Sequence, residues 1–155
     1  MTGSDRLFLD LTSDTVVLPG VRNSIREWCA ERGWNAEYVA DIVLAVDEAL
    51  SNVIKHGYGG KPGFKIELSA AVVDDPARGS AIEIRIRDFG KQVPVESIRG
   101  RDLDDIRPGG LGVHIIKSVM CVAEYSHAEG GGMLLVMRKY RVPQSQAECP
   151  PNEKP

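Results

Sequence analysis

Residues 47–57, with the sequence DEALSNVIKHG, combine a carboxylate and a carboxamide at a spacing suited to chemistry. Glu48 and Asn52 are four residues apart, so on a helix they leave the same side one turn apart. A carboxylate can orient or deprotonate a hydroxyl group, and a carboxamide oxygen can bind a hard cation without adding charge. The same pair is also typical of a solvated helix edge, so its interpretation depends on the motifs downstream.

A second motif, Asp88-Phe89-Gly90, follows a segment that we predict to be a strand. An aspartate at a strand end can accept a hydrogen bond from an exocyclic amine. The missing side chain at Gly90 would let a flat ring approach the backbone. The alternative interpretation is a strand-ending aspartate followed by an ordinary turn glycine.

The third motif is RPGGLGVH, residues 107–114, which leads into a predicted helix. Glycines before a helix leave amide N–H groups free to point at an anion, which the helix dipole also favours. The motif lacks the Lys-Ser/Thr ending of a P-loop, and it does not follow a strand as the dinucleotide fingerprint does. The alternative is a flexible hinge in front of a helix.

The elements that must position these motifs follow from hydrophobic periodicity. Alternation predicts strands at residues 7–11, 64–72, 82–86, 121–126 and 133–140, and the pair 64–72 and 82–86 is predicted to be antiparallel around the loop 74–79. Helical spacing predicts a first helix from about residue 21 that ends at Gly33. It predicts a second helix from the N-cap Asn35 to Gly57, and a third at residues 111–120.

The region between Phe89 and Gly110 is polar and long, which is typical of a functional lid or a disordered insert. The order of elements predicts an α+β fold, a two-layer sandwich in which helices cover one face of a mostly antiparallel sheet. We expect one domain over residues 1–142 and a disordered tail over residues 143–155, because that tail is rich in proline and polar residues.

Length, charge and composition argue against several classes of protein. The chain has 155 residues and a net charge of −3, so nucleic acid is not an expected partner. Its N-terminus lacks the layout of a secretory signal, and no apolar segment reaches the length of a membrane span. The three cysteines are widely spaced and match neither a disulfide framework nor a zinc site. We therefore expect reduced thiols in a cytoplasmic protein without a membrane association.

The three motifs, in this order and on these elements, resemble the GHKL ATPase superfamily, which includes gyrase-type ATPases and histidine kinase catalytic domains. Within it, DEALSNVIKHGY, DFG and PGGLGVHIIKSVM are similar to the N box and two glycine boxes of the small, single-domain anti-sigma-factor serine kinases. The resemblance extends over roughly residues 7–140. It implies the histidine kinase-like ATPase fold, with ATP and Mg²⁺ as cofactors.

The resemblance also implies roles for individual residues. Asn52 would hold Mg²⁺, Glu48 would orient or deprotonate the attacking hydroxyl, Asp88 would accept from the adenine amino group, and Gly90 would line the base pocket. The phosphates would lie at the start of the third helix. The residues implied there are Gly110, Leu111, Gly112 and Val113, with Arg107 or Arg101 of the lid as candidates to stabilise charge.

The resemblance implies a serine/threonine protein kinase that acts as an anti-sigma factor. It would bind a sigma factor and phosphorylate an anti-sigma-factor antagonist in a partner-switching cascade, as a homodimer. Two departures favour an alternative, a switch module that binds nucleotide weakly or not at all and only sequesters protein partners. The first glycine box lacks its second glycine, because Lys91-Gln92 follows Gly90, and Leu135 stands where the family commonly has a threonine.

Overall fold

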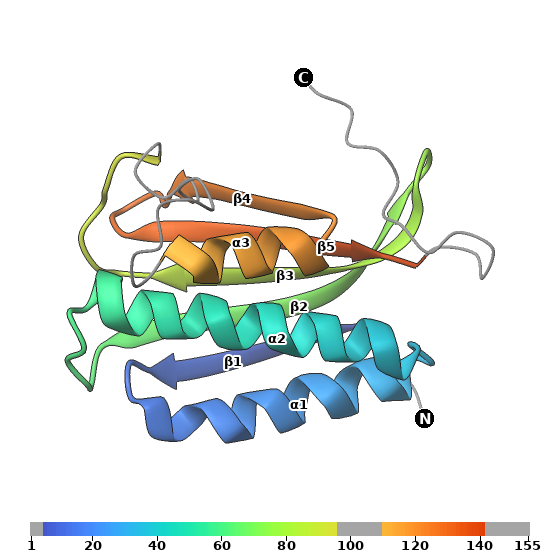
Figure 1. Cartoon of the computed structure of the whole chain (residues 1–155), viewed down its shortest axis with the longest axis horizontal. Helices are drawn as coiled ribbons and strands as arrows, with labels where there is room; N and C mark the ends of the chain where they lie inside the picture. The colour runs from blue at the N-terminus through green and yellow to red at the C-terminus, as the bar shows by residue number, and fades with distance from the viewer. Residues whose placement is uncertain (1–4, 96–109, 142–155) are drawn as a thin grey trace.

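The computed structural model describes residues 5–95 and 110–141, which form an α+β sandwich of two layers (Figure 1). This confirms the fold class expected from the sequence. The elements, in chain order, are β1 (Arg6–Thr12), the 3-10 turn η1 (Thr15–Val17), α1 (Leu18–Glu31), α2 (Ala36–Asn52), the π-helical turn η2 (Val53–Gly57), β2 (Lys65–Asp75), β3 (Gly79–Asp88), α3 (Gly110–Val119), β4 (Val122–His127) and β5 (Met133–Tyr140).

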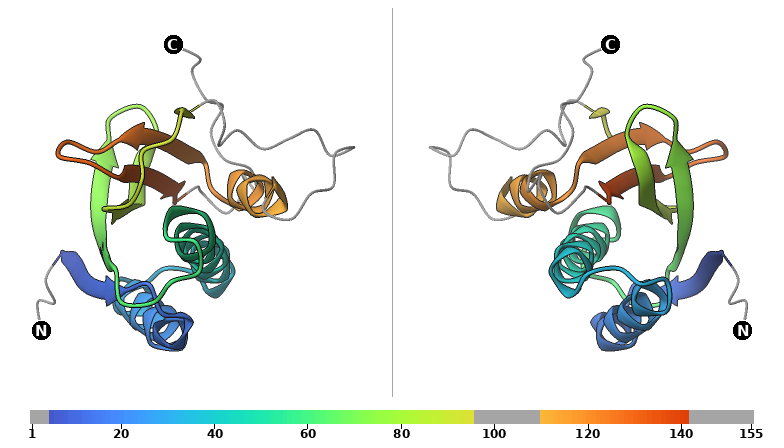
Figure 2. Two further views of the ribbon diagram at one scale, coloured as in Figure 1. Left: turned by 90° about the vertical axis from the view of Figure 1, so that its left-hand side faces the viewer. Right: turned by 90° about the vertical axis from the view of Figure 1, so that its right-hand side faces the viewer.

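The five strands form one sheet in the order β1-β2-β3-β5-β4, and every neighbouring pair is antiparallel. The three helices lie together on one side of this sheet, as the two end views show (Figure 2). Because side chains alternate along a strand, each strand sends every second residue into the layer between sheet and helices. The largest fully buried side chains of that layer are Ile25, Ile42, Leu50, Ile66, Leu68, Ile82, Ile84, Ile86, Ile116 and Met137.

Helix α2 runs through the centre of the helical layer and carries the first motif. Its N-terminus is capped as predicted, because the side chain of Asn35 accepts a hydrogen bond of 2.8 Å from the backbone N–H of Glu37. The sequence predicted one helix as far as Gly57. The structure instead changes from α- to π-helix after Asn52, and this π turn ends in Gly57 and Tyr58. A π turn widens the helix and is frequent at functional sites.

Other boundaries differ by a few residues. Strands β2 and β3 extend into the predicted loop 74–79 and leave residues 76–78 as the turn between them. Gly79 adopts a φ of +89°, which explains why a glycine ends this turn. Helix α3 begins at Gly110, one residue before its predicted start. The predicted tail, residues 143–155, lies outside the described residues.

The expectation of three reduced cysteines is correct for Cys29, which is free and buried, and wrong for Cys121, which is disulfide-bonded. Spacing along the chain does not reveal which cysteines the fold brings together. Within the described residues, no helix combines the length and the apolar character needed to cross a membrane.

No described element covers the sheet face opposite the helices (Figure 2). Glu83 lies at its centre with an exposed fraction of only 7%. Its two carboxylate oxygens accept hydrogen bonds of 2.7 Å from Arg85 and Arg138. Burial of Glu83 would raise the pKa of its carboxyl group, but these two guanidinium groups lower that pKa on balance.

Candidate functional site

Three chain segments that carry the sequence motifs meet at one end of the molecule. Figure 1 shows the C-terminal end of α2 with η2, the end of β3 and the start of α3 at the same end of the sandwich. Helices α2 and α3 are in contact, and they run in opposite directions. The end of one helix and the beginning of the other therefore lie together, which brings the N box close to the second glycine box.

The first motif occupies the last turns of α2. Glu48 and Asn52 are both half-buried, so they lie between the core face of the helix and solvent. The Nδ2 atom of Asn52 is buried and has no hydrogen-bond partner among the described residues. Burying an amide donor without a partner costs free energy, so this N–H₂ group is available to donate a hydrogen bond to water or to a ligand.

The side chain of Asp88 ends β3 and is 5% exposed. Its Oδ1 atom accepts hydrogen bonds from the backbone N–H groups of Gly90, at 3.0 Å, and Met133, at 3.2 Å. Burial raises the pKa of this carboxyl group, while the two hydrogen bonds and the charge of Arg87 oppose that rise. No described residue donates a hydrogen bond to Oδ2 of Asp88. This oxygen is therefore the acceptor that the site can offer to a ligand amine.

Asp88 lies directly against the end of η2. A Cβ atom added to Gly57 would lie 3.8 Å from Oδ2 of Asp88 and 3.9 Å from its Cγ. Gly57 is five residues beyond Asn52 on the continuous helical segment. The carboxylate at the strand end and the motif of the long helix therefore form one contiguous site.

In the structure, Gly90 packs against the end of the helical segment, whereas the sequence suggested a flat ring of a ligand beside it. A Cβ atom there would lie 2.8 Å from the Gly57 carbonyl oxygen and 3.2 Å from Cε1 of Tyr58. The missing side chain thus lets the chain after β3 pack against the helix end. The expected role of Gly90 in a base pocket stays a prediction, and the packing is sufficient reason for a glycine at this position.

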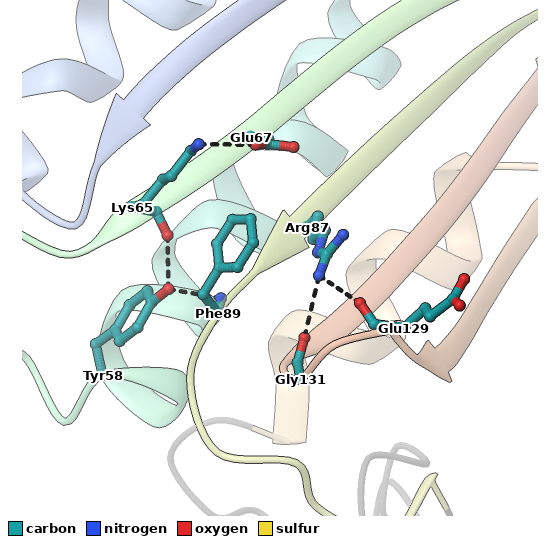
Figure 3. A network of polar contacts seen from close by, with 7 residues as sticks. All are labelled: Tyr58, Lys65, Glu67, Arg87, Phe89, Glu129 and Gly131. Carbon is teal, nitrogen blue, oxygen red and sulfur yellow. Dashed lines mark hydrogen bonds and ion pairs between the residues drawn. The ribbon is translucent and has the colours of Figure 1, made fainter.

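Tyr58 was not singled out from the sequence, yet it joins three segments around Asp88 (Figure 3). Its hydroxyl donates a hydrogen bond of 2.6 Å to the Lys65 carbonyl oxygen and accepts one of 2.7 Å from the backbone N–H of Phe89. Its ring stacks on Phe64, with ring centroids 4.9 Å apart. The only sequence signal was a tyrosine directly after the helix-ending Gly57.

The turn between β4 and β5 forms another side of the site. Gly132 adopts a φ of +78°, and a Cβ atom there would overlap the Asp88 carbonyl oxygen and lie 2.9 Å from the Cα of Phe89. Arg87 donates to the Glu129 carbonyl oxygen at 2.6 Å, as Figure 3 shows. The Gln92 side chain donates to the carbonyl oxygens of Ala128 and Gly132. In the sequence, the three consecutive glycines of this turn are the feature that could have indicated a close approach to another backbone segment.

Helix α3 contributes the second glycine box. The first turn of α3 consists of Gly110, Leu111, Gly112 and Val113. Their backbone N–H groups therefore belong to the N-terminal end of a helix. At the other end, Lys139 of β5 donates to the Val119 carbonyl oxygen at 2.7 Å and to Oδ2 of Asp41 in α2 at 3.1 Å. This buried lysine links α3 to α2 and so sets the position of the glycine box. Arg101 and Arg107 lie outside the described residues.

Leu135 lies in the interior at the position where a threonine was expected. It is 4% exposed and pairs with Ile86 across the β3–β5 ladder. It offers no hydroxyl to Asp88. The carboxylate is instead oriented by the backbone N–H groups of Gly90 and Met133, so its geometry does not depend on a side chain at position 135.

Comparison with known proteins agrees with this geometry. The histidine kinase-like ATPase domain family matches residues 11–139. A serine-protein kinase RsbW of Listeria monocytogenes is 26% identical over 147 residues, with 90% of this chain and 89% of the relative covered. An RsbW of Halalkalibacterium halodurans is 30% identical over 118 residues, which cover 70% and 66% of the two chains. The anti-sigma F factor of Heyndrickxia coagulans is 29% identical over 99 residues, covering 61% and 65%.

A solved structure has the same fold. The crystal structure of the RsbU and RsbW domains of a Mycobacterium tuberculosis protein aligns with a TM-score of 0.63 at 23% identity. The alignment covers 87% of this chain and 32% of the solved chain. Together with the matched relatives, it confirms the resemblance to small anti-sigma-factor serine kinases of the histidine kinase-like ATPase superfamily.

Proposed function

The chain belongs to the histidine kinase-like ATPase domain family, and we propose that it is an ATP- and Mg²⁺-dependent serine/threonine protein kinase that acts as an anti-sigma factor. One observation carries the proposal. The carboxylate of Asp88, with Oδ2 available, lies against Gly57 at the end of the helix that bears Glu48 and Asn52. In this proposal, Oδ2 of Asp88 is the adenine acceptor and Glu48 is the carboxylate that activates the hydroxyl, on elements that meet at this end of the sandwich.

In the proposed reaction, ATP is the phosphoryl donor. Oδ2 of Asp88 accepts a hydrogen bond from the adenine amino group, and Gly90 lies beside the base. The N–H groups of Gly110, Leu111, Gly112 and Val113 bind the phosphates at the start of α3, where the helix dipole favours negative charge. Arg107 or Arg101 would add positive charge near the γ-phosphate.

Glu48 is the proposed catalytic carboxylate. It orients the substrate serine or threonine hydroxyl and accepts its proton as the hydroxyl oxygen forms a bond to the γ-phosphorus and ADP leaves. Its half-buried position on a rigid helix suits this role, because it combines a fixed orientation with access for a protein substrate.

The residues present fit a magnesium ion that arrives with ATP. No cluster of three or more His, Cys, Asp or Glu side chains that could hold a metal occurs in the described part of the chain. The carboxamide oxygen of the half-buried Asn52 can instead supply one ligand beside the phosphate oxygens, as is common for Mg²⁺. The bound ion would supply charge stabilisation for the transferring phosphoryl group.

The proposed partners are a sigma factor, which the protein holds inactive, and an anti-sigma-factor antagonist, which it phosphorylates. The names of the matched relatives, serine-protein kinase and anti-sigma F factor, support both. The proposal includes a cytoplasmic location, where ATP and a sigma factor are present, and action as a homodimer.

A phosphotransfer assay tests the proposal. The protein is incubated with γ-labelled ATP, Mg²⁺ and a candidate antagonist, and Glu48→Gln is compared with Glu37→Gln, an exposed carboxylate in the first turn of the same helix. We expect transfer by the wild type and by Glu37→Gln, and at least a hundredfold loss in Glu48→Gln. Absence of transfer by the wild type, together with no shift in melting temperature at millimolar ATP, would contradict it.

The buried Leu135 favours one alternative, a switch module of the same fold that only sequesters partners. Losing one hydrogen bond near the base would cost about 0.5–1.5 kcal/mol, which weakens nucleotide binding roughly tenfold at most. Isothermal titration separates the two functions. A nucleotide dissociation constant in the micromolar range supports the kinase, whereas partner binding without any ATP binding supports the sequestering module.

A further inference from the structure

Gln92 lies in the first glycine box, at the place where the second glycine of the motif is missing. Its side chain reaches the β4–β5 turn, where Nε2 donates hydrogen bonds to the carbonyl oxygens of Ala128, at 3.1 Å, and Gly132, at 3.2 Å. An amide nitrogen carries two N–H donors, so one side chain can hold both ends of this turn. From this contact we propose that Gln92 is a positioning residue that fixes the Asp88 carboxylate for its ligand. The inference rests on the proposed function, in which that ligand is the adenine amino group of ATP.

One peptide group connects Gln92 to Asp88. The carbonyl oxygen of this group belongs to Gly132 and accepts the hydrogen bond from Gln92. Its N–H belongs to Met133 and donates to Oδ1 of Asp88 at 3.2 Å. Hydrogen bonds in a chain polarise one another, so acceptance at the carbonyl oxygen strengthens donation by the N–H. Gln92 therefore supports the bond that occupies Oδ1 and leaves Oδ2 of Asp88 available to a ligand amine.

This contact connects the two departures from the family pattern. Leu135 supplies no hydroxyl, and the backbone N–H groups of Gly90 and Met133 orient the Asp88 carboxylate instead. A glycine at position 92 would leave the second of these donors without the support of a side chain. The glutamine provides that support, so the two departures together preserve the acceptor. This relationship favours the kinase over the module that only sequesters partners.

The β4–β5 turn should stay folded without the Gln92 side chain. Gln92 is exposed, and both carbonyl oxygens that it contacts also accept from the backbone. The N–H of Ala128 donates to the Gly132 carbonyl oxygen at 3.0 Å, and the N–H of Gly131 donates to the Ala128 carbonyl oxygen at 3.2 Å. A variant at position 92 should therefore alter the Asp88 carboxylate with little change in the stability of the fold.

His127 offers a matched control, because it holds the same segment to the same hairpin by a different contact. Nε2 of His127 donates to the Val93 carbonyl oxygen at 2.8 Å, one residue beyond Gln92. This bond does not involve the peptide group that contacts Asp88. Variants at positions 92 and 127 thus both release the segment after β3, but only those at position 92 remove the support of Asp88.

The first measurement uses the full chain without nucleotide. The pKa of the Asp88 carboxyl group is measured by carbon-13 NMR titration in the wild type and in Gln92→Met. Glutamine and methionine are both uncharged, so a change in this pKa reports the hydrogen bond rather than a new charge. The hydrogen bond from Met133 lowers the pKa of Asp88, so we expect a higher pKa in Gln92→Met at an unchanged melting temperature. An unchanged pKa would overturn the inference.

The second measurement is isothermal titration with ATP in the presence of Mg²⁺. We expect Gln92→Met to bind ATP about two- to tenfold more weakly than the wild type, as for one lost hydrogen bond, and His127→Leu to bind as the wild type does. Equal weakening in both variants would mean that Gln92 only holds the segment, and it would overturn the inference. Wild-type affinity in Gln92→Gly, which restores the glycine of the motif, would overturn it too. If the wild type binds no ATP, the proposed kinase function fails, whereas the NMR comparison still decides the role of Gln92.

Discussion

The hydroxyl of Tyr58 accepts a hydrogen bond of 2.7 Å from the backbone N–H of Phe89, the residue that follows the proposed adenine-binding Asp88. The same hydroxyl donates to the first residue of β2, Lys65. One side chain after the N box thus holds the ends of two strands in position. Asp88 depends on this arrangement because its own carboxylate accepts from Gly90, one residue further along the chain.

Tyr58→Phe should weaken ATP binding more than it weakens the fold. The ring can keep its stack on Phe64, but the backbone groups of Lys65 and Phe89 each lose a partner, at a cost of about 1–3 kcal/mol. We expect a lower melting temperature and a several-fold higher dissociation constant for ATP by calorimetry. Tyr38→Phe is the control, since no hydrogen bond of that half-buried hydroxyl is part of the site. Equal nucleotide affinities for both variants would contradict this role.

Gly132→Ala should disrupt the site, and Gly131→Ala should not. Both glycines have positive φ, at +78° and +112°, so both substitutions cost about 1 kcal/mol or more from backbone strain. Only at Gly132 would the new methyl group overlap the backbone of Asp88, whereas nothing lies within 4 Å of the corresponding position at Gly131. Thermal unfolding and ATP titration should therefore show a much larger loss for Gly132→Ala, and similar losses would contradict the proposed contact.

Asp88→Asn should abolish adenine binding without lowering stability. Asparagine keeps an oxygen to accept from Gly90 and Met133, but its second group donates and cannot accept from an amine. Burial raises the pKa of Asp88, so the folded state binds more protons than the unfolded state between the unfolded and the folded pKa. The ionised carboxylate therefore costs stability above its folded pKa. We expect the variant to unfold at the same or a higher temperature at neutral pH, with no shift on adding ATP.

Glu83→Gln should have the opposite effect on the pH dependence of stability. Arg85 and Arg138 keep the folded pKa of Glu83 below its ordinary value, so its stabilisation is present above the unfolded pKa and is lost as pH falls through the folded pKa. The variant should lose about 1–3 kcal/mol of unfolding free energy at neutral pH and less in acid. Urea denaturation at several pH values measures this difference. A constant difference across pH would exclude an ionised Glu83 in the folded state.

The local pattern of apolar and polar residues was sufficient to predict the helices, the strands and the fold class. The apolar stripe of α2, the Asn35 cap and the alternating isoleucines of β3 each depend on neighbours within a few residues, so the sequence determines them directly. The sequence did not predict where every helix ends, because the change from α- to π-helix after Asn52 has no local sequence signal.

The candidate site depends on both the local sequence motifs and the tertiary structure. The order of the motifs along the sequence, with Glu48, Asn52 and Asp88 as its polar groups, indicated the family, which the comparisons confirm. Only the tertiary structure brought Gly57 to Asp88, Gly132 to the backbone of Asp88, and the Tyr58 hydroxyl between two strands. The contacts of Asp88 with Gly57 and Gly132, and of Tyr58 with Phe89, join residues 31 to 44 positions apart. Such approaches follow from how helices and strands pack, which the local sequence pattern does not specify.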